Sequence, residues 1–336
     1  MSKKRRQHTD DPKATVNPYA FVTSMWSPRL RECTVNEFKA GYADLAWMKH
    51  TVALLALILT LSGTGGAAES AEFTSLKQKA EAGDAASQFD LGWKYDSGDG
   101  VPKDAAEAVK WYRKASEKGH SSAQFNLGLA YASGDGVPKD AAEAANWYRK
   151  AAEQGVASAQ LNLGVMYHNG NGVPKDANEA VRWHRKAAEQ GSASAQLNLG
   201  LAYDSGSGVL KDPVEAVNWY RKAAEQGHAS AQFSLGACYA QGSGVPKDAA
   251  EAVKWYRKAA EQGRASAQFN LGVSYANGDG VVKDSTEAHA WWNVASAQGH
   301  QMAKEYLVDI EKQMTREQIA EATKLARERF EKFGKK

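Results

Sequence analysis

Cysteine is almost absent from this chain of 336 residues, which contains only Cys33 and Cys238. Two cysteines so far apart do not form a disulfide framework, and a structural zinc site needs four closely spaced ligands. A large excess of positive charge is absent too, because the net charge is only +3. We therefore expect no nucleic-acid partner, and we expect neither a metal nor a cofactor.

Proline is also scarce, with 8 residues, whereas glycine, tryptophan and tyrosine number 30, 10 and 13. Such counts suggest one aromatic and glycine-rich module that is copied several times. Hydrophobic residues make up 43% of the chain, which is enough for a substantial core.

No apolar run reaches the ~20 residues that a membrane span requires, so no stable membrane span is expected. A shorter apolar run, Thr51–Leu61, follows the basic start at Met48 and precedes small residues that end at Ala68. This order predicts a signal peptide over Met48–Ala68 and a periplasmic or secreted protein. Residues 1–47 are interpreted as a leader of doubtful translation, with Met48 as the alternative start. An uncleaved anchor or a fortuitous apolar run are the alternatives to the signal peptide.

The chain repeats itself at an offset of 36 residues. A Leu-Gly pair and a tryptophan recur in every copy without a slip in spacing. The glycines are Gly92, Gly128, Gly164, Gly200, Gly236 and Gly272, and the tryptophans are Trp111, Trp147, Trp183, Trp219, Trp255 and Trp291. A fixed period of this length is typical of solenoids. We predict six 36-residue repeats over residues 73–300 with an N-terminal capping helix, and C-terminal capping helices over residues 301–336.

Each copy has the pattern of two helices, as the copy Ser122–Gly155 illustrates. A first helix is expected from about Ala123 to Ala132, because its apolar residues fall on one helical face. Gly128 in this helix lets a neighbouring helix approach closely. The segment Gly134–Pro138 then breaks the helix, and turn geometry explains its glycines better than a calcium or phosphate site.

The second helix of this copy is expected to begin after Asp140, a good N-cap, with Glu143 placed to reach back to it. Trp147 and Tyr148 lie on its apolar stripe and are expected to fill the space between neighbours. Gly155 is expected to end the helix in the left-handed conformation. Copies of this kind cannot bury their surface alone, so they are expected to stack.

The chain ends in a charged segment, Arg316–Lys332. A final helix is expected to begin at Thr315, and Gln318 is placed to complete a capping box with it. Solenoids need polar terminal helices of this kind for solubility.

The motif carried by Ala123–Tyr131, Gly134–Val137, Asp140 and Ala144–Ala152 resembles the Sel-one-like repeat family, a relative of the tetratricopeptide repeat with a longer loop. The resemblance covers roughly residues 75–300. It implies an all-α fold, an α/α right-handed superhelical solenoid. It also implies an adaptor or scaffold that binds a protein or peptide partner, and in bacteria a regulator in the cell envelope.

An enzymatic function is the alternative. A cysteine-rich branch of the same family is linked to penicillin binding and β-lactamase activity, and it carries a cysteine pair in each repeat. This chain lacks those pairs, which favours the scaffold. No His-Glu-x-x-His or Gly-x-Ser-x-Gly motif occurs, and the scattered histidines are expected at the surface. These are His168, His184, His228 and His289.

The first helices are expected to contribute a peptide-binding groove. On a helical wheel, Phe125 and Leu129 cover a side that is expected to pack against a neighbouring repeat. The gap beside them is expected to face the groove, and it contains two columns of residues. The first column is Asp90, Asn126, Asn162, Asn198, Ser234 and Asn270; the second is Lys94, Ala130, Met166, Ala202, Cys238 and Ser274.

Asparagine side chains supply two donors and an acceptor, so a ladder of them can hold the backbone of an extended peptide. The alternative is that these asparagines bond to the backbone or loop of the adjacent repeat. Cys238 lies in the second column, where packing of a small residue is the preferred interpretation over a reactive thiol.

Overall fold

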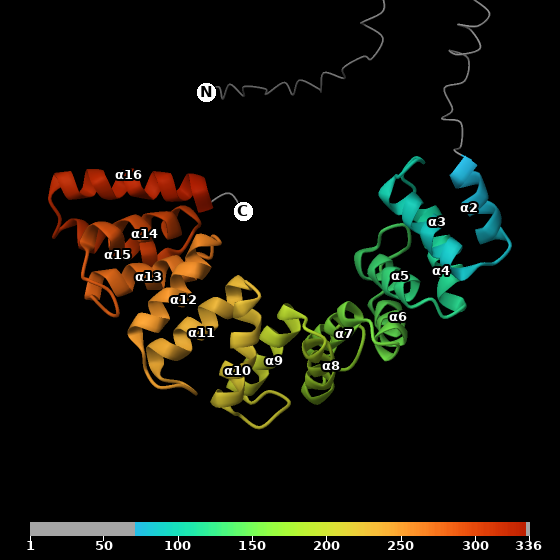
Figure 1. Ribbon diagram of the computed structural model, residues 1–336, viewed down its shortest axis with the longest axis horizontal. Helices are drawn as coiled ribbons and strands as arrows, with labels where there is room; N and C mark the ends of the chain where they lie inside the picture. Colours follow the sequence, from blue (N-terminus) through green and yellow to red (C-terminus); the bar gives the residue numbers. More distant parts are fainter. Residues whose placement is uncertain (1–70, 334–336) are drawn as a thin grey trace, which may run out of the picture. The chain divides into compact units, whose positions relative to one another are not determined.

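The computed structural model describes residues 71–333, and within this range it contains fifteen helices and no strand. Figure 1 shows these helices stacked pair after pair in one curved row, from α2 to α16. The predicted all-α class and the α/α solenoid of repeats are confirmed. The predicted leader and signal peptide lie outside the described residues.

Each repeat contributes a first and a second helix. The first helices are α3 (Ala85–Ser97), α5 (Ser121–Ser133), α7 (Ala157–Asn169), α9 (Ala193–Ser205), α11 (Ala229–Gln241) and α13 (Ala265–Asn277). The second helices are α4 (Ala105–Glu117), α6 (Ala141–Glu153), α8 (Ala177–Glu189), α10 (Pro213–Glu225), α12 (Ala249–Glu261) and α14 (Ser285–Ala297). The row begins with α2 (Ala71–Glu81) and ends with α15 (Gln301–Glu311) and α16 (Arg316–Phe333).

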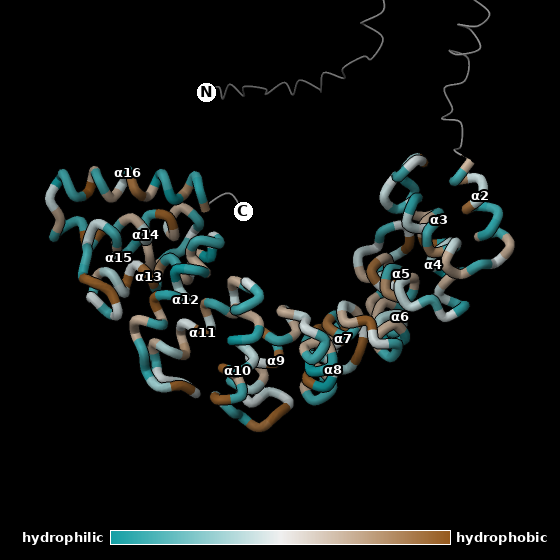
Figure 2. The backbone as a smooth tube through the Cα atoms, in the orientation of Figure 1, coloured by the Kyte–Doolittle hydropathy of each residue, from teal (hydrophilic) through white to brown (hydrophobic). Residues whose placement is uncertain are grey.

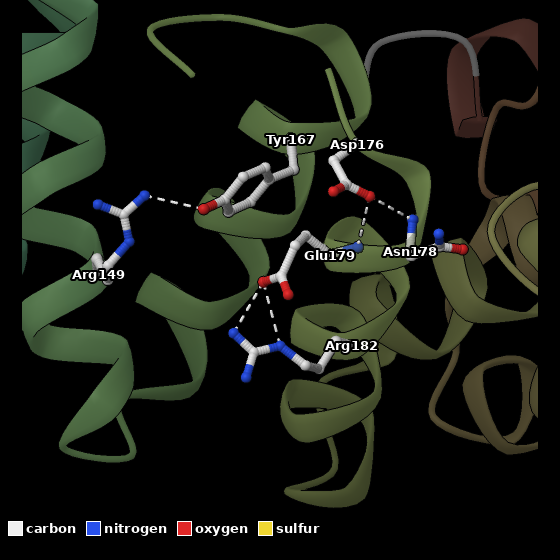
Figure 3. Close-up of polar contacts among 6 residues, drawn as sticks. All are labelled: Arg149, Tyr167, Asp176, Asn178, Glu179 and Arg182. Carbon is white, nitrogen blue, oxygen red and sulfur yellow. Dashed lines mark hydrogen bonds and ion pairs between the residues drawn. The ribbon is translucent and has the colours of Figure 1, made fainter. Parts of the chain in front are cut away.

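The second helices begin at the predicted aspartates. The Asp140 carboxylate accepts hydrogen bonds from the backbone N–H groups of Ala142 (2.9 Å) and Glu143 (3.0 Å). Figure 3 shows the same cap at Asp176. The expected return bond from Glu143 is replaced by another, because the Asp140 N–H donates to the Tyr131 carbonyl at 2.9 Å. This bond closes the loop onto the last turn of the first helix.

Glycine in the Leu-Gly pair makes room for an aromatic ring. A Cβ atom at Gly128 would lie 2.6 Å from the Tyr148 ring, so any larger residue would displace that ring. Trp147 and Tyr148 are both buried, and they share one core cluster with residues of the neighbouring repeats. The predicted role of these aromatics is confirmed, whereas Gly128 makes room for a ring and not for the backbone of a neighbouring helix.

The loop glycines also join one repeat to the next. Gly136 has a φ of +71°, which favours glycine, and a Cβ atom there would lie 2.2 Å from the Ala105 carbonyl oxygen. Ala105 is the first residue of α4, in the preceding repeat. Turn geometry is therefore one reason for glycine at this position. The close contact with the preceding repeat is the other.

A ladder of paired glutamines, one buried and one exposed in each pair, runs along the stack and was not predicted from the sequence. The Gln124 Nε2 donates to the Ser116 carbonyl (3.2 Å), and its Oε1 accepts from Gln154 (2.7 Å). Corresponding pairs join Gln190 to Gln160, Gln226 to Gln196, Gln262 to Gln232, and Gln298 to Gln268. The recurrence of both glutamine columns, broken only by Lys118 in the first repeat, was the signal in the sequence.

A second ladder joins each second helix to the next first helix. The Arg149 guanidinium donates to the Tyr167 hydroxyl at 2.9 Å, as Figure 3 shows. Equivalent bonds join Arg113 to Tyr131, Arg185 to Tyr203, Arg221 to Tyr239, and Arg257 to Tyr275. Neighbouring repeats are thus held by polar contacts as well as by apolar packing.

The last helix folds back on the stack. Thr315 and Gln318 form the predicted capping box, with bonds of 2.9 and 3.2 Å between each backbone N–H and the other side chain. Figure 2 shows α16 coloured largely as hydrophilic. Its few apolar residues, including Ala326, pack against Ala290 and Val294 of α14.

Candidate peptide-binding face

Large apolar side chains form an exposed stripe along the first helices. Trp93, Leu129, Val165 and Leu201 occupy the same repeat position and are 48, 40, 38 and 46% exposed. Ala237 and Val273 continue the column and are half-buried. We call these six residues the apolar stripe. Exposed apolar residues that line up in this way are typical of a binding surface.

The stripe corrects the wheel prediction. Phe125 packs beside Tyr148 of its own repeat, with ring centroids 5.8 Å apart, and Leu129 is not covered by a neighbouring repeat. The second predicted column is buried instead of open, since Ala130, Met166 and Cys238 are 9, 6 and 7% exposed. The reason is that the preceding repeat packs against the side of the first helix that carries this column.

The asparagine column lies at the boundary between stripe and core. Asn126, Asn162, Asn198 and Asn270 are half-buried, as is Ser234, whereas Asp90 is exposed. Burial raises the pKa of Tyr112 in the preceding repeat, and hydrogen bonding to Asn126 partly offsets that rise. The same holds for Tyr148 with Asn162 and for Tyr256 with Asn270. Three of the asparagines are thus paired with a tyrosine side chain of the preceding repeat, and Asn198 lies 3.4 Å from the His184 Nε2.

Clefts open beside several of these asparagines. One cleft, of about 110 Å³, is lined by Asn126, Leu129 and Tyr112. A second, of about 260 Å³, is lined by Asn270, Val273 and Tyr256. A third, of about 310 Å³, is lined by Asn198, Leu201 and His184. The recurring composition is one asparagine, one residue of the apolar stripe and one ring from the preceding second helix.

Met166 and Lys94 contribute less to this face than the sequence suggested. Met166 belongs to the core cluster around Leu163. Lys94 is paired with Asp99 at 2.8 Å, so its charge is already matched within the first repeat. Of the predicted first column, Asn126, Asn198 and Asn270 line the clefts. Ala130, Ala202 and Ser274 of the second column also line them.

The first helices carry very little charge. Helices α5, α11 and α13 contain no charged residue at all. The serine hydroxyls near the stripe are satisfied within their own helices, as where Ser133 donates to the Leu129 carbonyl at 3.0 Å. This face therefore suits an uncharged partner better than a charged one.

Two histidines are buried, contrary to the prediction that all four are at the surface. His184 and His289 are 5 and 1% exposed, because they occupy buried columns that hold mostly tyrosine and mostly valine in the other repeats. Burial, with a smaller contribution from His168, lowers the pKa of His184 to about 4, so its imidazole is neutral at pH 7. The break in the tyrosine column was the signal in the sequence.

Cys238 is a buried free thiol. Burial raises its pKa to about 11, so the nucleophilic thiolate is suppressed at neutral pH, in line with the packing role preferred for this residue. Among residues 71–333, no group of three or more His, Cys, Asp or Glu side chains is placed to share a metal ion. In the same range no helix combines the length and apolarity needed to cross a membrane.

The model of the Sel1 repeat matches residues 85–120, 121–156, 157–192, 193–228, 229–263 and 265–300, which together exceed half of the chain. The chain belongs to the Sel1 repeat family. Sel1 repeats generally mediate protein interactions. The matched segments begin 36 residues apart, in agreement with the predicted period.

Solved Sel1 repeat structures resemble this protein. One is c5321, a protective antigen of uropathogenic Escherichia coli with an SLR fold: it is 42% identical, with a TM-score of 0.69, over 77% of this chain and 56% of that protein. Another is a Sel1 repeat protein of Oxalobacter formigenes: it is 40% identical, with a TM-score of 0.60, over 72% of this chain and 96% of that protein. No curated protein matches the chain. The hydrolase alternative gains no support from these findings.

Proposed function

We propose that this Sel1 repeat protein is an exported scaffold, an adaptor or regulator in the bacterial envelope, that binds an uncharged, apolar segment of a partner protein along the apolar stripe. The observation that carries the proposal is the exposure of Trp93, Leu129, Val165 and Leu201 at one repeat position. Burying such side chains against a partner is favourable by roughly 25 cal/mol per Å² of apolar surface.

The neighbouring asparagines supply polarity without charge. Asn126, Asn162, Asn198 and Asn270 are half-buried, and with Ser234 and, in the first repeat, Asp90 and Lys94, they flank the stripe. Amide groups at this repeat spacing can bond the backbone of an extended segment while the stripe takes its side chains. The predicted peptide-binding role of this column remains part of the proposal.

A peptide-display selection against the protein tests the role of the stripe. We expect enrichment of uncharged, apolar sequences, and we expect binding to be lost when Leu129→Lys and Leu201→Lys are combined. The matched control combines Leu210→Lys and Val214→Lys, which are 90 and 58% exposed but lie outside the stripe. Equal loss in both variants, or enrichment of charged peptides, would overturn the proposed surface.

Export is tested separately, by sequencing the N-terminus of the protein recovered from the cell envelope. We expect a mature chain that begins near Glu69. Recovery of envelope protein that still carries residues 1–47 would contradict export through Met48–Ala68.

A further inference from the structure

Two repeats lack the tyrosine that packs on the first-helix glycine: the sixth has the larger Trp292, and the third has the smaller His184. The ring that packs on the first-helix glycine is Tyr112, Tyr148, Tyr220 or Tyr256 in four repeats, but it is His184 in the third. The imidazole packs at the same place as the tyrosine rings, against the glycine of the first helix. A Cβ atom at Gly164 would lie 2.4 Å from His184 Cδ2, just as one at Gly128 would lie 2.6 Å from Tyr148 Cδ1.

Histidine is shorter than tyrosine, so the outer part of the phenol has no counterpart here. In three sibling repeats this part ends in a hydroxyl that is hydrogen-bonded to an asparagine of the next repeat, such as Asn126 at Tyr112. In the third repeat the corresponding Asn198 meets the His184 Nε2 instead, at 3.4 Å. This contact is long for a hydrogen bond, so the asparagine is poorly satisfied.

The residue that flanks the phenol hydroxyl in the first repeat also has a different counterpart in the third repeat. In the first repeat Asp96 accepts a hydrogen bond from the Tyr112 hydroxyl at 3.3 Å. The equivalent residue of the third repeat is His168, which is exposed and lines the cleft. The third repeat thus has hydrogen-bonding groups on both sides of the place that a phenol hydroxyl takes in its siblings.

The cleft beside His184 opens onto the face that carries the apolar stripe. The cleft of about 310 Å³ is floored by Ala180 and Val181 and bounded by Val165 and Leu201 of the apolar stripe. Ligand pockets span roughly 300–1,000 Å³, so this volume suits a single side chain or a small ring. The walls are largely apolar, and the polar groups come from the two histidines, Asn198 and, at the edge, Ser205 and Ser207, which matches an aromatic ring that carries one hydroxyl.

We propose that this cleft binds the phenol ring of a tyrosine side chain presented by the partner, with the hydroxyl placed between Asn198 and His168. The bound ring replaces the part of the tyrosine that His184 lacks, so the partner completes the third repeat. This inference deepens the proposed function, since it names the anchor residue of a partner that lies on the apolar stripe.

Titration of the full chain with p-cresol, the side chain of tyrosine, tests the cleft without any peptide. We expect saturable binding, followed by NMR shifts of the Val165, His184 and Leu201 amides, and contacts between the p-cresol ring and the Val165 and Leu201 methyl groups. Toluene has the same ring without the hydroxyl, and we expect it to bind at least about tenfold more weakly, because Asn198 then stays unsatisfied.

His184→Tyr restores the sibling residue and should fill the cleft, which removes p-cresol binding while the melting temperature is maintained. Tyr148→His is the converse variant, and we expect it to create a second site beside Asn162. If His184→Tyr fails to fold, the contacts seen by NMR in the unaltered protein still decide the question.

Three outcomes would overturn the inference: no saturable binding of p-cresol, equal binding of toluene, or unchanged binding in a folded His184→Tyr protein. None of them rejects the apolar stripe, because Leu129 lies outside this cleft and Leu129→Lys alone therefore tests the stripe, whereas Leu201 lines the cleft. Loss of peptide binding in Leu129→Lys together with absent p-cresol binding would reject the anchor and keep the scaffold.

Discussion

The guanidinium of Arg329 lies 4.4 Å from the centre of the Trp291 ring, so the last helix contributes a cation to the last repeat. In the preceding repeats a lysine of the same helix does this, as where Lys258 lies 4.0 Å from the Trp255 ring centre. The sixth repeat has Val294 at that position, and Arg329 of α16 takes over.

We expect Arg329→Ala to loosen α16. Arg329 also bonds both carboxylate oxygens of Glu287, at 2.6 and 2.8 Å, and the substitution removes these bonds together with the contact on Trp291. The free energy of unfolding should fall by about 1–2 kcal/mol, because the pair is only partly exposed. Hydrogen exchange of α16 measures the effect. Arg327→Ala on the same helix is the control, and equal exchange in both variants would contradict the role of Arg329.

The loop glycines allow backbone strain to be separated from contact between repeats. Gly100 and Gly136 occupy the same loop position with φ of +76° and +71°. Gly136 is packed against the preceding repeat, whereas, apart from its chain neighbours, no atom of residues 71–333 lies within 4 Å of a Cβ atom at Gly100. Alanine at Gly100 should cost about 1 kcal/mol for the left-handed backbone alone. Alanine at Gly136 should cost clearly more, since its Cβ would meet the Ala105 carbonyl oxygen at 2.2 Å. Urea unfolding of both variants compares them, and equal losses would show that the contact is unimportant.

The loss of stability on replacing a glutamine of the ladder should depend on which glutamine is replaced. Gln196→Ala removes a bond to the Ala188 carbonyl (3.1 Å) and leaves Gln226 without its acceptor, so we expect a loss of about 1–3 kcal/mol. Gln88→Ala is the matched control. In the described part of the chain the Gln88 Oε1 has no hydrogen-bond partner, because Lys118 replaces the donor glutamine and bonds the Gly83 carbonyl instead. A thermal-unfolding series should rank Gln196→Ala as the more damaging change, and the opposite order would reject the ladder.

His184 should make the protein less stable in mild acid. Burial lowers its folded-state pKa to about 4, below the ordinary value of 6.5, so only the unfolded chain takes up this proton between those values. Stability is therefore fully present above about pH 6.5 and falls as the pH drops toward 4, by on the order of 3 kcal/mol. His184→Tyr does not titrate in this range. The difference between the two urea-unfolding curves from pH 7 to pH 4 isolates the histidine, and a constant difference would show that His184 is not buried in its neutral form.

The sequence alone determined the repeat architecture. The unbroken 36-residue spacing of Leu-Gly and Trp, with Asp before each second helix, left stacked helix pairs as the way to bury those side chains, and the caps at Asp140 and Thr315 could be predicted because capping is local. The family of interaction scaffolds followed from the same motif.

Only the tertiary structure decided which side of the first helices is open. A helical wheel gives the angle between Leu129 and Ala130 but not the side on which the preceding repeat packs, and that repeat covers Ala130 while it leaves Leu129 exposed. The cleft at His184 and the reach of Arg329 to Trp291 depend in the same way on residues of other helices. Contacts within one helix follow from its own sequence, whereas contacts between helices depend on how the repeats are rotated against each other, which a one-dimensional pattern does not contain.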